Sequence, residues 1–282
     1  MLRISQLFIY PIKSLGGIGV LSAEVTRTGF LYDRQWMLVD SHLRFITQRE
    51  MPQMALLQVG LTDSGLQVYH KKHPDHIFNL PFSPPAGGRV TVTIFEETCE
   101  AVYASREADT WFSAVLATNC RLVYMPEDAR RYVDTRYAID NDSTGFADGY
   151  PYLIIGQASL DDLNNRLSQP LAINRFRPNI VFTGGLPFEE DAMEQFTVDS
   201  LHFFGVKPCA RCAITTVNQE DGTRNKEPLK TLATYRQVNN KIFFGQNLIA
   251  RAVGTIKVGD MIKRIKMSGA VNYGLPGSDP YT

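Results

Sequence analysis

The chain has 282 residues, enough for one large domain or two small ones, and its 44% hydrophobic and 21% charged residues are an ordinary soluble composition. Its 29 basic and 29 acidic residues cancel, which argues against a general nucleic-acid-binding protein because such proteins are usually basic. We find no signal peptide, and no apolar stretch approaches the ~20 residues of a membrane helix. We therefore expect a cytoplasmic protein with neither a nucleic-acid nor a membrane partner.

The first third of the sequence predicts β-strands, because short runs are rich in β-branched and aromatic residues and are separated by glycine and proline. These runs are residues 7–10, 36–39, 43–47, 90–95 and 98–103. Glu96 and Glu97 separate the last two runs, so we expect a hairpin there. Residues 83–88 predict a loop, and the whole pattern is typical of a barrel or sandwich.

Helices are expected at three places. Ser105 can cap a helix over residues 106–117, Ser159 opens an approximate capping box before residues 160–167, and Pro228 can start a helix that runs to about Tyr235. Near the end, residues 255–258 and 261–262 predict two strands joined by a tight turn. We expect an N-terminal β-rich domain over residues 1–120, a second domain over 121–266 and a flexible tail over 267–282.

Two cysteines, Cys209 and Cys212, stand three residues apart and close to Lys207 and Arg211, whose charges favour a thiolate. A zinc site would need a second pair of ligands, and a thioredoxin-like redox pair would need a helix after the motif. The remaining interpretations are a single thiolate ligand to a soft metal, with Cys212 as the ligand, or two small buried residues. The sequence pattern alone leaves these alternatives open.

Basic residues recur beside hydroxyl groups, glycine or proline at the ends of predicted strands. Arginine forks and hydroxyl groups suit a phosphate, so together these positions indicate one polyanionic cofactor held by several loops. Arg130 and Arg131 are predicted to lie on the surface, and Asp148 either accepts hydrogen bonds from a ligand or caps a turn. The three crowded histidines, His70, His73 and His76, are predicted to lie in a solvated loop. The positions beside hydroxyls, glycine or proline are Lys13, Ser14, Arg34, Thr47, Arg49, Arg175, Arg177 and Asn179.

Ordered sequence blocks along the chain carry a family resemblance. They include Tyr10-Pro11-Ile12-Lys13-Ser14, Asp33-Arg34-Gln35-Trp36-Met37, Phe45-Ile46-Thr47-Gln48-Arg49, Phe146-Ala147-Asp148-Gly149-Tyr150-Pro151, Arg175-Phe176-Arg177-Pro178-Asn179 and Lys207-Pro208-Cys209-Ala210-Arg211-Cys212. By these blocks the chain resembles MOSC-domain proteins with an N-terminal MOSC β-barrel domain, among them bacterial YcbX-type proteins and the mitochondrial amidoxime-reducing component.

The resemblance implies a β-dominated α+β fold, in which a MOSC β-barrel packs against a smaller N-terminal β-rich domain with a molybdenum–pterin cofactor between them. It implies that Cys212 is the metal ligand, since a soft thiolate suits molybdenum. Asp148 and Arg49 are the candidates for orienting substrate or delivering a proton. The residues expected to hold the cofactor are Lys13, Ser14, Thr47, Arg49, Arg175, Arg177, Asn179 and Cys212.

The implied activity is the reduction of N-hydroxylated compounds (hydroxylamines, amidoximes and N-hydroxylated bases) to amines or amidines. An alternative is a non-redox carrier of molybdenum cofactor or of cysteine-bound sulfur, with pyridoxal phosphate unlikely because no sulfurase domain is present. No cysteine follows Cys212, so we expect no iron–sulfur cluster in this chain and a separate electron donor, a ferredoxin- or flavin-type reductase. One departure from the family pattern is Glu50, which stands where relatives usually have glutamine.

Overall fold

Strands dominate the structure, as the β-branched and aromatic runs predict, and the expected β-dominated α+β class is confirmed. The computed structural model describes residues 1–83 and 87–269. No helix within these two segments combines the length and the apolarity needed to cross a bilayer. The helices and 3-10 turns are α1 (Arg106–Leu116), α2 (Gln157–Asn164), α3 (Leu229–Leu232), η1 (Pro52–Leu56), η2 (Ile173–Arg175), η3 (Glu189–Ala192) and η4 (Ala213–Thr216).

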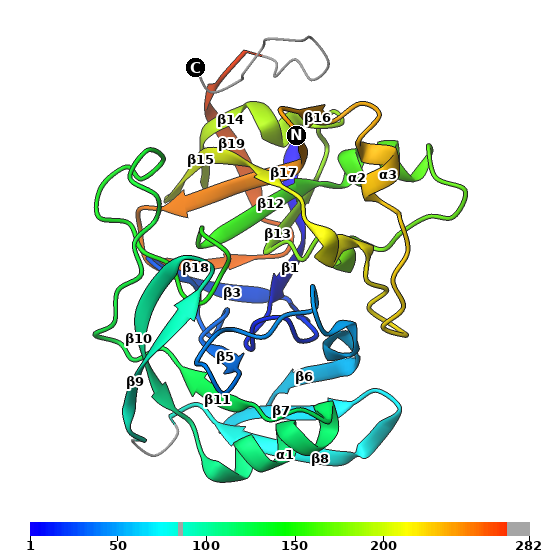
Figure 1. Cartoon of the computed structure of the whole chain (residues 1–282). Coiled ribbons are helices and arrows are strands. Elements are labelled where there is room, and N and C mark those ends of the chain that lie inside the picture. The colour runs from blue at the N-terminus through cyan, green and yellow to red at the C-terminus, as the bar shows by residue number, and fades with distance from the viewer. Residues whose placement is uncertain (84–86, 270–282) are drawn as a thin grey trace.

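A closed seven-stranded barrel forms the upper half of the molecule in Figure 1, and the pairing of β12 with β17 closes it. Its inward side chains form an apolar core that excludes water, because alternate residues of each strand face the interior. Two short strands, β2 (Ile18–Val20) and β16 (Gln237–Val238), extend the sheet. In sheet order the barrel strands are β12 (Tyr152–Gly156), β13 (Ile180–Thr183), β1 (Leu2–Ile9), β19 (Met261–Met267), β14 (Met193–Val198), β15 (Leu201–Ala210) and β17 (Lys241–Ala250).

The first strand of the chain lies in this barrel, between strands from the C-terminal half. β1 pairs with β13 and β19, and β3 (Ser22–Thr26) pairs with β4 (Gly29–Phe30) and β18 (Gly254–Lys257). The expected domain boundary near residue 120 stays a prediction. The sheets themselves cross this boundary, since strands within residues 2–30 share sheets with strands within residues 152–267.

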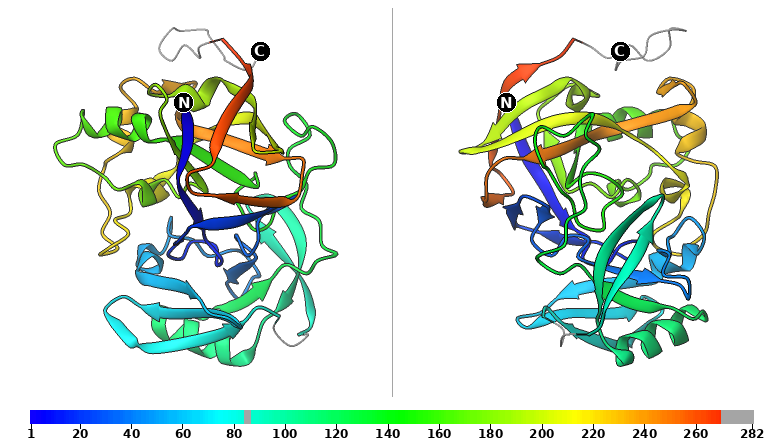
Figure 2. Two further views of the ribbon diagram at one scale, coloured as in Figure 1. Left: turned by 180° about the vertical axis from the view of Figure 1, so that it is seen from behind. Right: turned by 60° about the vertical axis from the view of Figure 1, so that its left-hand side comes forward.

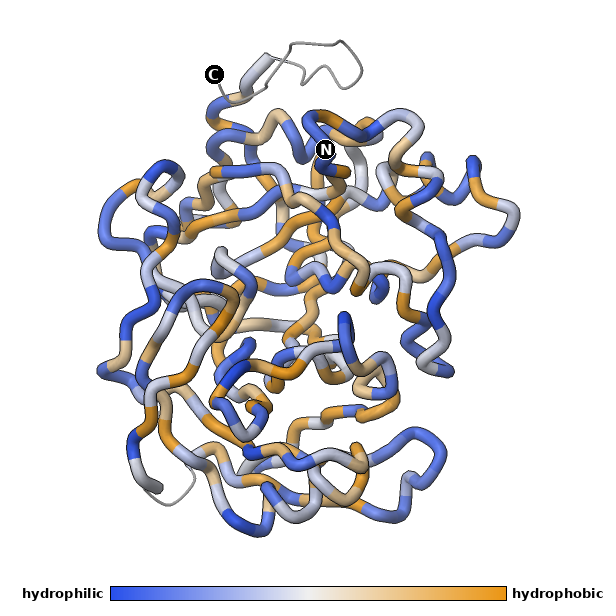
Figure 3. Tube along the Cα trace, viewed as in Figure 1, coloured by the Kyte–Doolittle hydropathy of each residue, from blue (hydrophilic) through white to orange (hydrophobic). Residues whose placement is uncertain are grey.

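Two smaller sheets form the lower half of the molecule (Figure 2). One is four-stranded, with β5 (Trp36–Val39), β11 (Arg121–Tyr124), β10 (Glu97–Tyr103) and β9 (Arg89–Ile94) in that order. The other is three-stranded, with β6 (Leu57–Leu61), β7 (Gly65–His70) and β8 (His73–Pro81). Together with α1 they enclose a second apolar core, while hydrophilic segments gather in the outer loops in Figure 3.

Most predicted strands of the first third are present. The run 36–39 is β5, the hairpin is β9–β10, and the run 7–10 falls at the end of a strand that begins at Leu2. The predicted strand 43–47 is wrong, because Leu43 has a left-handed backbone (φ 60°) and only isolated bridges form at Arg44 and Phe45. The loop predicted around His70, His73 and His76 is also wrong, because His70 is the last residue of β7 and His73 is the first residue of β8.

The first predicted helix is confirmed as α1, where the Ser105 hydroxyl accepts a hydrogen bond from the Ala108 amide at 3.1 Å. The capping box at Ser159 is wrong: α2 begins two residues earlier, and the buried Ser159 hydroxyl donates to Glu190 Oε2 at 2.8 Å. α3 is shorter than predicted, whereas the two strands expected near the end are present as β18 and β19, which belong to different sheets. Of the expected tail, residues 270–282 lie outside the described residues, as do residues 84–86 of the expected loop.

Candidate cofactor site

A cavity of about 120 Å³ opens between the barrel and the smaller sheets, with Cys212 in its wall. Its lining comes from the Lys13–Ser14 turn, Arg34, the loop 147–150, the start of β12, the residues after η2, the end of β15 with the residues that follow it, and Asn247 of β17. The charged residues of its lining are four cations and one carboxylate, so the cavity attracts anions. These residues are Lys13, Arg34, Arg177 and Arg211, with Asp148 as the carboxylate.

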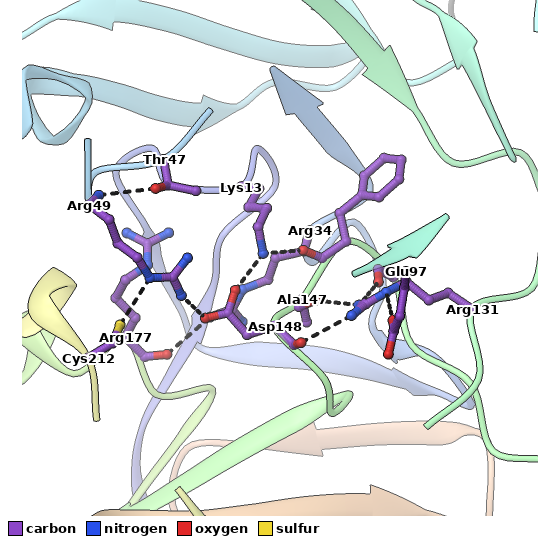
Figure 4. Close-up of polar contacts among 12 residues, drawn as sticks. Lys13, Arg34, Thr47, Arg49, Glu97, Arg131, Ala147, Asp148, Arg177 and Cys212 are labelled. Carbon is purple, nitrogen blue, oxygen red and sulfur yellow. Dashed lines mark hydrogen bonds and ion pairs between the residues drawn. The ribbon is translucent and has the colours of Figure 1, made fainter. Parts of the chain in front are cut away.

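Asp148 joins two of the basic segments (Figure 4). Its Oδ1 accepts a hydrogen bond from Lys13 Nζ and its Oδ2 accepts one from Arg49 Nη2, both at 2.6 Å. Burial raises the pKa of this carboxyl group, but the charges of Lys13 and Arg49 outweigh burial and hold the pKa well below its usual range. Burial also lowers the pKa of Lys13 to about 8, against the opposing charge of Asp148.

Arg49 also reaches the sulfur of Cys212. Its Nε lies 3.3 Å from Cys212 Sγ, and its main-chain amide is held by Thr47 Oγ1 at 3.1 Å. Arg49 and Cys212 are 163 residues apart in the sequence, so only the folded chain brings this guanidinium to the sulfur.

The cations expected beside Cys212 serve other groups. Arg211 Nη1 lies 2.9 Å from Cys209 Sγ, and Lys207 Nζ lies 4.1 Å from the ring centroid of Tyr137. Burial raises the pKa of the Cys209 thiol, although Arg211 opposes this shift. Both cysteines line the cavity, but they differ in their neighbouring arginine.

A stack of two arginines on Tyr10 forms another part of the wall. The guanidinium carbons of Arg34 and Arg177 lie 4.4 and 4.3 Å from the Tyr10 ring centroid, within range of a cation–π contact. Arg34 Nη1 donates to Asn179 Oδ1 at 3.1 Å, and Arg34 Nη2 donates to the main-chain oxygen of Arg177 at 3.2 Å. Burial and the charge of Arg34 lower the pKa of Arg177 to about 10.

The structure thus brings most of the expected site residues together. Lys13, Ser14, Asp148, Arg177, Asn179 and Cys212 line the cavity, and Arg49 contacts two of them. Arg175 is absent from the lining; it is buried and donates to the main-chain oxygen of Thr215 at 3.4 Å. Thr47 acts through the Arg49 backbone, and Glu50 is exposed, away from the lining.

The predicted surface position of Arg131 is wrong, because its side chain is buried. Its guanidinium donates to the main-chain oxygens of Gly145, Ala147 and Asp148 at 3.2, 2.5 and 3.1 Å, and its Nε donates to Glu97 Oε2 at 2.8 Å. It therefore holds the loop that carries the Asp148 carboxylate (Figure 4). No local pattern marks this role, because its partners come from two other parts of the chain.

Family comparisons agree with this architecture. Residues 1–119 match the MOSC N-terminal beta barrel domain and residues 141–263 match the MOSC domain. The chain is 32% identical to mitochondrial amidoxime-reducing component 1 of Mus musculus, over 92% of this chain and 81% of that protein. It belongs to the MOSC-domain family of amidoxime-reducing components.

Other relatives are similar over comparable lengths of this chain. The human mitochondrial amidoxime-reducing component 1 is 31% identical, over 92% of this chain and 82% of that protein. The molybdenum cofactor sulfurase of Oryza sativa subsp. japonica is 30% identical over 86% of this chain, which corresponds to 32% of that longer protein. For this MOSC-domain protein the match includes both the barrel and the smaller sheets, so the resemblance in the sequence is confirmed.

Proposed function

We propose that this protein binds a molybdenum–pterin cofactor in the Cys212 cavity and reduces N-hydroxylated compounds. The support is the combination of a thiol with an excess of cations around one cavity. A phosphate-bearing pterin needs positive charge and hydrogen-bond donors, and molybdenum accepts a soft sulfur ligand. The relatives named amidoxime-reducing components suggest the substrate class.

Two buried donors in this region suit such a group. Arg49 Nη1 and Arg177 Nη2 are shielded from solvent and have no hydrogen-bond partner among the residues that the structure describes. Leaving a buried charged donor unpaired is costly, so an anionic ligand that accepts from them stabilises the site. The residues present therefore fit a phosphate-bearing cofactor, with Lys13, Arg34 and Arg177 on its anionic part and Cys212 as the metal ligand.

The reaction we propose consumes two electrons and two protons: R–NHOH becomes R–NH₂ and water. When bound, the cofactor would supply the two-electron chemistry, and the protein would supply position and protons. Asp148, with its lowered pKa, stays ionised and orients cationic or hydrogen-bonding groups of the substrate. Lys13, with a pKa of about 8, holds on Nζ a proton that can be transferred near neutral pH. A separate electron-donor protein would restore the electrons.

Metal content and turnover of the purified chain test this proposal. We expect bound molybdenum by elemental analysis, and reduction of benzamidoxime with a chemical electron donor. Cys212→Ser should lose both, whereas Cys209→Ser, which changes the other thiol of the same cavity, should keep the metal. Equal molybdenum in wild type and Cys212→Ser would remove Cys212 as the ligand.

The similarity to a molybdenum cofactor sulfurase supports a second candidate, a non-redox carrier of the cofactor or of cysteine-bound sulfur. A carrier would release its cofactor to an acceptor protein and would not turn over benzamidoxime. An enzyme would keep molybdenum through gel filtration and would turn over many times. The same preparation therefore separates the two functions.

A further inference from the structure

A second cavity, of about 140 Å³, shares only Arg177 with the lining of the cofactor site. Its walls come from the end of β1, the glycine turn before β2, β6, the turn after β7, the residues around η2 and the turn after η4. It therefore lies where the barrel meets the three-stranded sheet. None of the proposed chemistry at Cys212 uses it.

Two donors of this cavity lack partners. The Tyr10 side chain is 1% exposed and Arg177 is 8% exposed, and neither the Tyr10 hydroxyl nor Arg177 Nη2 has a hydrogen-bond partner within residues 1–83 and 87–269. Burial raises the pKa of Tyr10 to about 12, so the phenol keeps its proton and remains a donor. Two unsatisfied donors on one cavity favour a ligand that accepts hydrogen bonds.

The charge of the cavity favours an anion. Lys71 and Arg177 are its two cations, and Lys71 Nζ is held in place by the Gln219 main-chain oxygen at 2.6 Å. Its one carboxylate, Glu220, lies 3.4 Å from Lys71 Nζ and is 71% exposed, so solvent screens its charge. The excess positive charge is on the buried side, where an anion interacts more strongly than in water.

The turn beside this cavity requires glycine at position 17. A Cβ at Gly17 would lie 2.3 Å from Tyr10 Cε1, so only glycine lets the turn pass the edge of this ring. The volume corresponds to that of about five water molecules.

We propose that this cavity is a binding site for a small oxyanion, a phosphate or a carboxylate, held by the Tyr10 hydroxyl, Arg177 Nη2 and Lys71 Nζ. The proposal depends on the geometry of this cavity, and it shares Arg177, whose Nη2 carries two N–H groups, with the cofactor site proposed above. It predicts a second anion site even in a protein without molybdenum.

Calorimetric titration of the purified full-length chain with inorganic phosphate, at constant ionic strength set by chloride, tests this site. We expect binding by the wild type and a Kd at least ~10-fold higher for Tyr10→Phe, because one hydrogen bond to a charged group is lost. Tyr10→Phe deletes a hydroxyl that has no partner, so it should leave the fold intact. Lys71→Gln should also weaken binding, while Lys72→Gln, an exposed neighbour outside the lining, should not.

Lys13→Gln separates this site from the cofactor cavity, since Lys13 lines only the latter. The proposal expects phosphate affinity to survive Lys13→Gln. Phosphate binding that is lost in Lys13→Gln and unchanged in Tyr10→Phe would overturn it, as would the absence of binding up to ~10 mM phosphate. A parallel titration with acetate shows whether the carboxylate or the phosphate is the better ligand.

Discussion

Replacing Arg131 with alanine would remove the side chain that holds the loop of Asp148. Arg131 is 4% exposed and donates to three main-chain oxygens between Gly145 and Asp148. Without it, those three oxygens lose a charged donor, and the Asp148 carboxylate loses the support that directs it toward Lys13 and Arg49. We therefore expect lower stability together with weaker retention of an anionic cofactor.

The magnitude follows from these contacts. Hydrogen bonds from a charged donor contribute about 1.5–3 kcal/mol each, and they do not add fully when they share one group. The ion pair with Glu97 adds little, because the Glu97 side chain is 55% exposed. We expect Arg131→Ala to lower the free energy of unfolding by about 3–5 kcal/mol, the usual cost of breaking a buried charged contact. Arg131→Lys should lose roughly half of this, since one ammonium cannot reach all three oxygens.

Urea unfolding at neutral pH measures these differences, and Arg130→Ala is the matched control. Arg130 is the adjacent residue, is exposed, and donates to the nearby main-chain oxygens of Glu127 and Ala129. Its replacement should change the free energy of unfolding by less than about 0.5 kcal/mol. If both alanine variants unfold at the same urea concentration as the wild type, the assignment of Arg131 to the Asp148 loop is refuted.

Three further outcomes concern single groups. Burial, then the charge of Asp191, raises the pKa of Glu190 above its ordinary 4.5. The contribution of the Glu190 carboxyl group to stability is therefore complete below pH 4.5 and is lost as the pH rises through the raised pKa. The free energy of unfolding of Glu190→Gln, measured with urea across the pH range, should change less with pH than that of the wild type. Burial lowers the pKa of Lys13 to about 8, so the wild type should retain less molybdenum above that pH, whereas Lys13→Arg should keep it. Elemental analysis after gel filtration measures the retained metal. Equal losses in the two proteins would contradict a role of the Lys13 charge in holding the cofactor. Ser105→Ala removes the cap on the Ala108 amide and should cost about 1 kcal/mol in thermal or urea unfolding.

Local sequence patterns were sufficient for several elements of this fold. The alternation of the hairpin β9–β10 and the Ser105 cap of α1 both use residues close together in the chain. The family blocks likewise pointed to Cys212, Lys13 and Arg177, which the folded chain brings to one cavity. The hairpin and the helix cap are readable because they depend on the period of a strand and on the first turn of a helix.

Other features depended on contacts between distant residues. The predicted cap at Ser159 failed because its hydroxyl bonds to the buried Glu190, 31 residues away. Arg131 looked like a surface residue, but its partners lie 14 to 17 residues later and, in Glu97, 34 residues earlier.

The sequence by itself determined the family, the β-dominated class and the candidate sulfur at Cys212. Only the tertiary structure decided that β1 lies within a barrel built mainly from the C-terminal half, that Arg49 is the cation beside Cys212, and that Asp148 links Arg49 to Lys13. The physical reason is that burial and electrostatic pairing depend on distances in space, and a residue's neighbours along the chain do not specify them.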